Sequence, residues 1–153
     1  MKKTITSFEW SVLKNLVNDN SIVLVGGCFD ILHPGHLAFL NEAKKLGSIL
    51  VVLLESDESV KKRKGNDRPI NKSSIRAKNL LEQTPTNIVI TLPFPFEDKD
   101  YDNLVTEIKP AIIATTKGDP YINHKLRQVQ KIDAELIEVI ERLSGHSTTN
   151  SLR

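Results

Sequence analysis

The sequence predicts an α/β protein with a Rossmann-like, five-stranded parallel sheet and helices on both faces. Short continuous apolar runs, of which ILVVLL at 49–54 is the longest, are typical of strands that are covered on both sides. Stretches with apolar residues at helical spacing separate these runs. Strands that alternate with helices over short links indicate right-handed crossovers and therefore a parallel sheet.

The five strands are expected at 21–27, 49–56, 87–92, 111–116 and 134–140. Helices are expected at 7–18, 35–47, 73–83, 100–109 and 123–132, with short ones within 57–69 and near Ser147. Gly47, Pro85 and Pro110 stand where three of the helices should stop. Residues 1–20 are interpreted as an N-terminal helical extension that packs on a domain formed by residues 21–153.

The composition excludes several classes of protein. The net charge of the 153 residues is only +2, from 21 basic and 19 acidic residues, which argues against a nucleic-acid partner. The single cysteine, Cys28, excludes an intramolecular disulfide and argues against a cysteine-based zinc site. No apolar stretch follows Lys2 and Lys3 as in a signal peptide, and no apolar run could cross a bilayer. We therefore expect a cytoplasmic protein with no membrane partner.

Polar segments follow four of the expected strands. They are GGCFDILHPGH at 26–36, ESDESVKKRKG at 55–65, TTKGDPY at 115–121 and RLSGHSTTN at 142–150. The carboxyl ends of parallel strands meet at one edge of the sheet, where α/β proteins bind ligands at the switch point in strand order. The sequence therefore predicts a functional site at this edge.

The segment GGCFDILHPGH has the features of a phosphate-binding turn. Gly26 and Gly27 allow a close approach of the backbone, and Gly35 begins a helix whose free amides favour an anion. His33 and His36 would lie beside that anion as donors. A metal site is a weaker alternative because no H-E-x-x-H partner is present, and the Walker and dinucleotide-binding glycine patterns are absent. By itself, the segment indicates a phosphate-binding α/β protein.

The same segment resembles the G-x-F-D-x-x-H-x-G-H signature of the cytidylyltransferase-like nucleotidyltransferases. Three further segments resemble this family, so that the match extends from Val23 to Asn150: NEAKKLGSILVV, VKKRKG…RPIN…R and RLSGHSTTN. The resemblance implies a nucleotidyltransferase fold over 21–153. It also implies transfer of a nucleotidyl group from ATP or CTP to a phosphorylated small-molecule acceptor, with release of pyrophosphate and with Mg²⁺ as cofactor.

The resemblance also implies roles for individual residues. The catalytic group would be His33, His36 and Lys44. The nucleotide would be bound by Gly27, Cys28, Phe29, His33, Gly35, His36, Lys117, Gly118, Asp119, Arg142, Ser147, Thr148 and Thr149. The substrate phosphates would be bound by Lys61, Lys64 and Arg76. Asp30 is expected to order the loop, and no side-chain cage for the metal is expected.

The base and the acceptor stay open. The RPIN and KGD segments most resemble the heptose-1-phosphate adenylyltransferase domain of ADP-heptose synthase, then glycerol-3-phosphate cytidylyltransferase and FAD synthetase-like enzymes. Pro120 departs from the family pattern near the base, so the choice between ATP and CTP is not determined. A non-catalytic nucleotide-binding module on the same fold is the alternative from another class, and a homodimer is possible.

Overall fold

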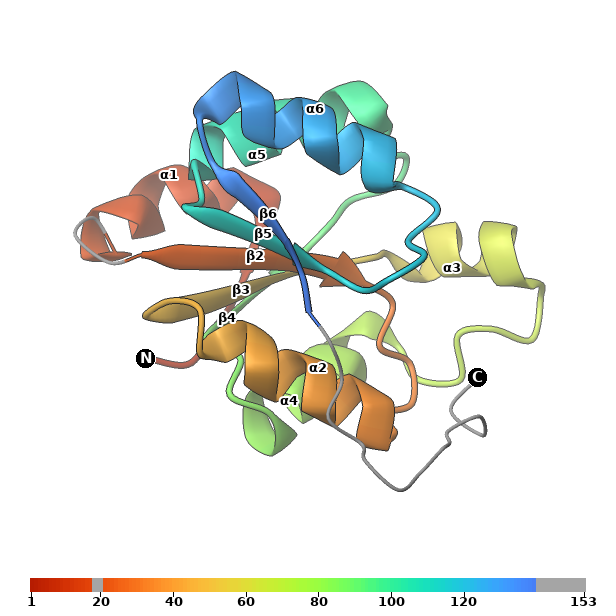
Figure 1. The fold of residues 1–153 in the computed structure, drawn as a ribbon. Helices are drawn as coiled ribbons and strands as arrows, with labels where there is room; N and C mark the ends of the chain where they lie inside the picture. Colours follow the sequence, from red (N-terminus) through yellow and green to blue (C-terminus); the bar gives the residue numbers. More distant parts are fainter. Residues whose placement is uncertain (18–20, 140–153) are drawn as a thin grey trace.

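The structure, a computed structural model, describes residues 1–17 and 21–139. A parallel sheet of six strands in the order β1-β4-β3-β2-β5-β6 forms its centre (Figure 1). The strands are β1 (Lys3–Thr6), β2 (Ile22–Gly27), β3 (Ile49–Leu54), β4 (Ile88–Thr91), β5 (Ile112–Thr115) and β6 (Glu135–Glu138). The parallel α/β architecture expected from the sequence is confirmed, with one strand more than expected.

Helices cover both faces of the sheet. They are α1 (Trp10–Leu13), flanked by the 3₁₀ turns η1 (Ser7–Glu9) and η2 (Lys14–Val17), and then α2 (Pro34–Lys44), α3 (Asp57–Lys64), α4 (Ser73–Gln83), α5 (Asp98–Ile108) and α6 (Ile122–Ile132). Helices α2 and α4 lie on one face, and α1, α5 and α6 lie on the other (Figure 1). Helix α3 lies beyond the carboxyl edge of the sheet (Figure 1). No helix in the two described ranges is long and apolar enough to span a membrane.

Strand β3 shows how the sheet builds two cores. All six of its residues are buried, and successive side chains point to opposite faces. Leu50, Val52 and Leu54 pack with residues of α2 and α4. Ile49, Val51 and Leu53 pack with residues of α1, α5 and α6. This division explains why the strand is a continuous apolar run.

The sixth strand, β1, corrects the expectation of five. It pairs in parallel with β4, from Lys3 opposite Ile88 to Thr6 opposite Thr91. The segment KTIT buries only Ile5, so its sequence carries little apolar signal. Its strand character comes from the free edge of β4, a partner that lies far away in the sequence.

The expected helix over 7–18 is replaced by η1, α1 and η2, which together make a short, uneven helical segment. Helical spacing predicts one apolar face formed by Phe8, Val12, Leu13, Leu16 and Val17. Trp10, Leu13 and Val17 are buried, whereas Phe8 and Val12 are exposed, so the expected face includes two residues that the fold leaves outside. The division of the chain at residue 20 stays a prediction.

The strand order places the site. From β2 the chain adds β3 and then β4 on one side, and it returns to place β5 and β6 on the other side. The switch point therefore lies between β2 and β5. In such sheets, ligands bind beyond the carboxyl ends of the strands on either side of the switch. Here those ends lead into the Gly26–His36 segment and the segment that follows Thr115.

Candidate active site

The loop between β2 and α2 is tightly packed around Phe29. Phe29 has a left-handed φ of +46°, which is uncommon for a residue with a side chain. A Cβ atom on Gly27 would lie 2.9 Å from the Phe29 ring, so any larger residue at 27 would displace this ring. Phe29 in turn contacts the His36 ring edge-on, with 5.4 Å between the centroids. Gly27 and Phe29 therefore set the position of His36.

His33 is the N-cap of α2. Its Nδ1 accepts hydrogen bonds from the amides of Gly35, at 3.1 Å, and His36, at 3.3 Å. Because Nδ1 is an acceptor, the proton of the neutral ring lies on Nε2. His33 can therefore donate a hydrogen bond to a ligand through that nitrogen.

His36 stacks on His33, with 3.7 Å between ring centroids and an interplanar angle of 15°. Its Nδ1 lies 3.1 Å from the Ile31 carbonyl oxygen and 3.4 Å from the His33 amide nitrogen. Burial, the adjacent His33 ring and the Lys64 ammonium lower the pKa of His36 to about 4, although the Ile31 carbonyl opposes them. The ring is therefore neutral near pH 7 when no ligand is bound.

The N-terminus of α2 differs from the bare anion site expected from the sequence. Pro34 has no amide hydrogen, and the amides of Gly35 and His36 are used by the His33 side chain. The Leu37 amide donates to the His33 carbonyl oxygen. The first-turn amides are therefore occupied, and an anion at this helix would meet imidazole groups, with the helix dipole behind them.

Asp30 joins the motif loop to the segment before α4. Its carboxylate accepts hydrogen bonds from the amides of Ile70 (2.7 Å) and Asn71 (2.8 Å) and from Nε of Arg68 (3.0 Å). Burial opposes ionisation of this group, but the three donors together hold the pKa of Asp30 below its usual value. The expectation that Asp30 orders the loop is confirmed.

Arg76 is fully buried in α4. Its guanidinium donates to the Asn71 carbonyl (2.9 Å), the Cys28 carbonyl (2.9 Å) and the Asp57 carboxylate (2.6 Å). These three acceptors and the burial leave no surface for a substrate. Arg76 therefore holds the motif loop against α3 and α4, in place of the phosphate contact that the resemblance implies.

The structure separates Lys44 from the two histidines. Lys44 is the last residue of α2, whereas His33 caps its first turn. Eleven helical residues span about 16 Å, so the helix carries Lys44 toward the opposite edge of the sheet. There, burial and the charge of Lys44 lower the pKa of Lys2. Lys44 is therefore not part of the group that forms around His33.

Three residues of the basic run at the end of α3, Lys61, Arg63 and Lys64, have different neighbours. Lys64 lies close enough to His36 to lower its pKa. Arg63 forms an ion pair with Glu55, the residue after β3. Lys61 lines a pocket on another side of the helix. Of the two lysines expected to bind phosphate, Lys64 is the one whose charge acts on His36.

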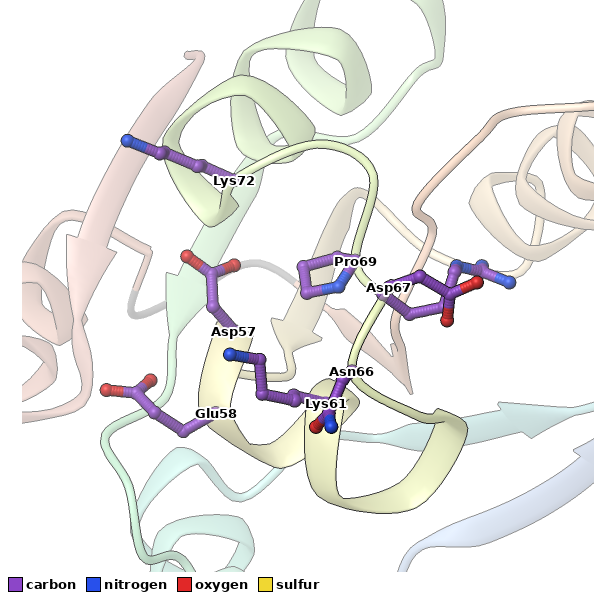
Figure 2. A pocket seen from close by; sticks show the side chains of 8 residues that line it. Asp57, Glu58, Lys61, Asn66, Asp67, Pro69 and Lys72 are labelled. Atoms are coloured by element: carbon purple, nitrogen blue, oxygen red, sulfur yellow. The ribbon is translucent and has the colours of Figure 1, made fainter.

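The pocket at Lys61 lies between α3 and the loop that precedes α4 (Figure 2). It has a volume of about 320 Å³, and its lining carries three cations and three carboxylates: Asp57, Glu58, Lys61, Asn66, Asp67, Arg68, Pro69 and Lys72. Figure 2 shows Asp57, Glu58 and Lys61 projecting from α3. The mixed charges do not favour an anion over a cation.

The loop after β5 is held by Asp119. Its carboxylate accepts hydrogen bonds from the Thr115 hydroxyl (2.5 Å) and the Tyr121 amide (2.8 Å), and it forms an ion pair with Lys125 of α6. Burial opposes ionisation, but Lys125, Thr115 and Tyr121 together lower the pKa of Asp119. Gly118 has a φ of +79°, while Lys117 is exposed. This rigid loop borders the switch point from the β5 side.

Sequence reasoning missed several residues that position the site. Arg68, Asn71, Asp57 and Lys125 hold Asp30, Arg76 and Asp119 in place. No spacing rule assigns them a role, because each acts on a residue in another element. Two signals were available: the RPIN segment contains Arg68 and Asn71, and Lys125 lies near the start of the helix that follows KGDPY.

The late segment of the expected site, with Arg142, Ser147, Thr148 and Thr149, lies outside the described residues. Among residues 1–17 and 21–139, no group of three or more histidine, cysteine, aspartate or glutamate side chains is placed to hold a metal ion.

The sequence and the fold are similar to those of known proteins. The cytidylyltransferase-like family model matches residues 24–149, and the chain belongs to this family. Among its relatives are the bifunctional protein HldE of Helicobacter hepaticus and that of Nitratiruptor sp. The first is 39% identical over 141 residues, which are 92% of this chain and 27% of that protein. The second is 41% identical over 129 residues, which are 84% and 26%.

The chain thus spans about a quarter of the length of these relatives. A solved structure, the lipopolysaccharide core biosynthesis protein from Thermoplasma volcanium, superposes with a TM-score of 0.65 and 26% identity. That match covers 80% of this chain and 98% of the other.

Proposed function

We propose that this protein transfers an adenylyl group from ATP to a sugar phosphate, with heptose 1-phosphate as the first candidate, and releases pyrophosphate. The observation that carries the proposal is the stacked pair of His33 and His36 at the start of α2, beside the switch point between β2 and β5. Membership of the cytidylyltransferase-like family supports nucleotidyl transfer as the reaction.

In this reaction the chain supplies position and charge. Nε2 of His33 carries a proton and donates to a phosphate oxygen, while Lys64 adds a cation near His36. Negative charge of the triphosphate raises the pKa of His36, so that its ring can also donate. Donors fixed in advance stabilise the charge that develops on the phosphoryl oxygens in the transition state.

The chemical step is a displacement at the α-phosphorus. An oxygen of the acceptor phosphate forms a bond to this phosphorus, and the bond from the α-phosphorus to the oxygen that bridges to the β-phosphorus breaks. Pyrophosphate leaves with the bonding electrons. Because the acceptor phosphate is already an anion, the step needs no general base.

We assign Mg²⁺ to the triphosphate. Mg²⁺ is usually bound through substrate phosphates and water with few protein ligands, and it neutralises the charge on phosphate oxygens.

The acceptor and the base are proposed from the relatives. HldE is ADP-heptose synthase, which carries a heptose-1-phosphate adenylyltransferase domain. This chain matches about a quarter of HldE, and we propose that it corresponds to that domain. CTP with glycerol 3-phosphate is the alternative pair to be tested. We place the reaction in the cytoplasm, and a homodimer, which light scattering would detect, stays a prediction.

The experiment is a pyrophosphate-release assay on the full chain with Mg²⁺, ATP or CTP, and a panel of sugar and polyol phosphates. We expect turnover with ATP and heptose 1-phosphate, and mass spectrometry should find the nucleotide sugar. His36→Ala should lower kcat by about a hundredfold or more, as for the loss of one oxyanion donor.

His124→Ala is the matched control, because His124 lies on the surface of α6, where it contacts Asp98 and Arg127. It should leave kcat unchanged. Nucleotide binding in calorimetry without turnover on any triphosphate and acceptor pair would favour the non-catalytic binding module instead.

A further inference from the structure

Four side chains lie at the carboxyl edge of the sheet, and none of them was assigned an individual role from the sequence. Glu55 follows β3, Arg63 lies on α3, Tyr101 lies in the first turns of α5, and Tyr121 precedes α6. Burial and the charges of Glu55 and Tyr121 raise the pKa of Tyr101 to about 12, whereas Arg63 acts to lower it. The segments that carry these groups all begin at the carboxyl edge of the sheet, after β3, β4 and β5, and we call the four groups the Glu55 cluster.

The Glu55 cluster adjoins the motif loop. The Glu55 amide donates to the Gly27 carbonyl oxygen at 3.1 Å. Gly27 is one of the residues expected to bind the nucleotide, so a molecule held by this cluster would lie beside the nucleotide.

In the charged half of the cluster, Glu55 and Arg63 are held by hydrogen bonds, but Arg63 keeps donors that no residue uses in these bonds. Arg63 donates from Nε and Nη2 to the two oxygens of Glu55, and the Ser59 hydroxyl also donates to Glu55, at 3.2 Å. A guanidinium has five N–H donors, so three remain for a ligand. The side chain of Glu55 is 14% exposed and that of Arg63 is 39% exposed, so the pair is anchored at one end and open at the other.

Tyr101 and Tyr121 give the cluster apolar ring faces and polar hydroxyl groups. Aromatic residues make up only 5% of the chain, yet Phe96, Tyr101 and Tyr121 gather after β4 and β5 at this edge. Phe96 packs edge-on against Tyr101, with 4.8 Å between centroids. Tyr121 is 52% exposed although its amide is fixed by Asp119. Within the described residues, neither tyrosine hydroxyl has a hydrogen-bond partner.

We propose that the Glu55 cluster is the acceptor subsite and that it binds the ring of a sugar phosphate. A carboxylate accepts hydrogen bonds from neighbouring ring hydroxyls, the tyrosine hydroxyls add donors, and aromatic faces cover the C–H faces of the ring. The donors of Arg63 that Glu55 does not use would bind the acceptor phosphate. This inference rests on the proposed transfer to a sugar phosphate and specifies where that substrate lies.

The test compares two substrates in the same variants. In Glu55→Gln and in Tyr101→Phe, the KM for the sugar phosphate should rise about tenfold, while the KM for ATP stays within about twofold, as for one lost charge-assisted hydrogen bond. Glu107→Gln, an exposed carboxylate on α5, is the matched control and should change neither KM. Thermal melts of each variant would check that it folds.

An unchanged acceptor KM in both variants, or a rise in the KM for ATP instead, would overturn the assignment of the subsite. Calorimetry with heptose 1-phosphate alone separates this inference from the proposed reaction. If the wild type binds the sugar phosphate without turnover and Glu55→Gln loses binding, the subsite stands and the proposed reaction falls. If Glu55→Gln binds as tightly as the wild type, the subsite falls.

Discussion

At the scale of single residues, the site depends on two stacked imidazole rings that the motif loop holds in place. His33 uses Nδ1 to cap the helix, which leaves its Nε2 hydrogen for a ligand. His36 is held between the Phe29 and His33 rings. The motif loop therefore fixes the orientation of both rings in the absence of a ligand, as the proposed stabilisation of a transition state requires.

The lowered pKa of His36 predicts how stability depends on pH. Its pKa is about 4 in the folded protein against an ordinary value of 6.5. Between these values the unfolded chain binds more protons than the folded one, so the free energy of unfolding rises with pH. The contribution of His36 is complete above 6.5 and is lost as the pH falls through about 4.

Urea unfolding of the wild type and of His36→Gln from about pH 4.5 to pH 7 would measure this effect. We expect a smaller slope of stability against pH in the variant, with His124→Gln as the control that keeps the wild-type slope. Equal slopes in His36→Gln and the wild type would show that His36 is not the titrating group.

At the scale of elements, buried polar links hold the motif loop between α3 and α4. Arg76 joins α4 to Cys28 and Asp57, and Asp30 joins the loop to the residues before α4. The links from Arg76 to Cys28 and from Asp30 to Asn71 span 48 and 41 residues of sequence, and the link from Arg76 to Asp57 spans 19. The loop geometry that orients the histidines is therefore a property of three elements together.

Arg76→Met tests this link. The change removes three donors and leaves the Cys28 carbonyl and part of the Asp57 carboxylate without their partner. We expect the free energy of unfolding to fall by about 3 kcal/mol, because the Cys28 and Asn71 carbonyls lose their donor and each unsatisfied buried acceptor costs about 1 to 3 kcal/mol. Urea unfolding would measure it.

Arg127→Met, which removes an exposed ion pair with Asp102, is the comparison and should cost less than about 1 kcal/mol. A similar loss of unfolding free energy in the two variants would mean that the buried hydrogen bonds of Arg76 stabilise the fold no more than an exposed ion pair does.

At the scale of the whole molecule, the N-terminal segment is part of the sheet and of its core. Strand β1 pairs along the edge of β4, and Ile5, Trp10 and Leu13 are buried in the core that includes α5. An uncovered β4 would present a row of free backbone groups and apolar side chains to other molecules. The segment therefore completes one end of the sheet.

Ile5→Ala and Val12→Ala compare a buried and an exposed position in this segment. Ile5 is 4% exposed and Val12 is 77% exposed. Ile5→Ala should lower the free energy of unfolding by about 2 to 4 kcal/mol, the cost of truncating a buried isoleucine, and Val12→Ala by less than about 0.5 kcal/mol. Equal effects in chemical denaturation would show that β1 is not packed in the folded protein.

Much of the fold could be predicted because its signals are local. The continuous apolar runs predicted β2, β3, β4 and β5 within one or two residues, and α4 was predicted with its observed bounds, Ser73–Gln83. Strand β1 could not be predicted, because a four-residue segment with one buried side chain is a strand only beside β4. The exposure of Phe8 and Val12 also depends on tertiary packing, since helical spacing alone grouped them with the buried residues.

The sequence by itself determined the parallel α/β architecture, the edge at which polar segments gather, and the histidine motif after β2. These features follow from periodicity and from short motifs, which express contacts between residues close in the chain. Only the tertiary structure decided which polar side chains remain available to a ligand. Arg76 and Asp119 form hydrogen bonds and ion pairs within the chain. Lys44 lies at the far end of α2 from the histidines, and Glu55 lies beside the motif with Arg63 as its ion-pair partner. The physical reason is that a charged group acts on whatever the fold places within hydrogen-bond distance, and for Arg76 that partner is Cys28, 48 residues away.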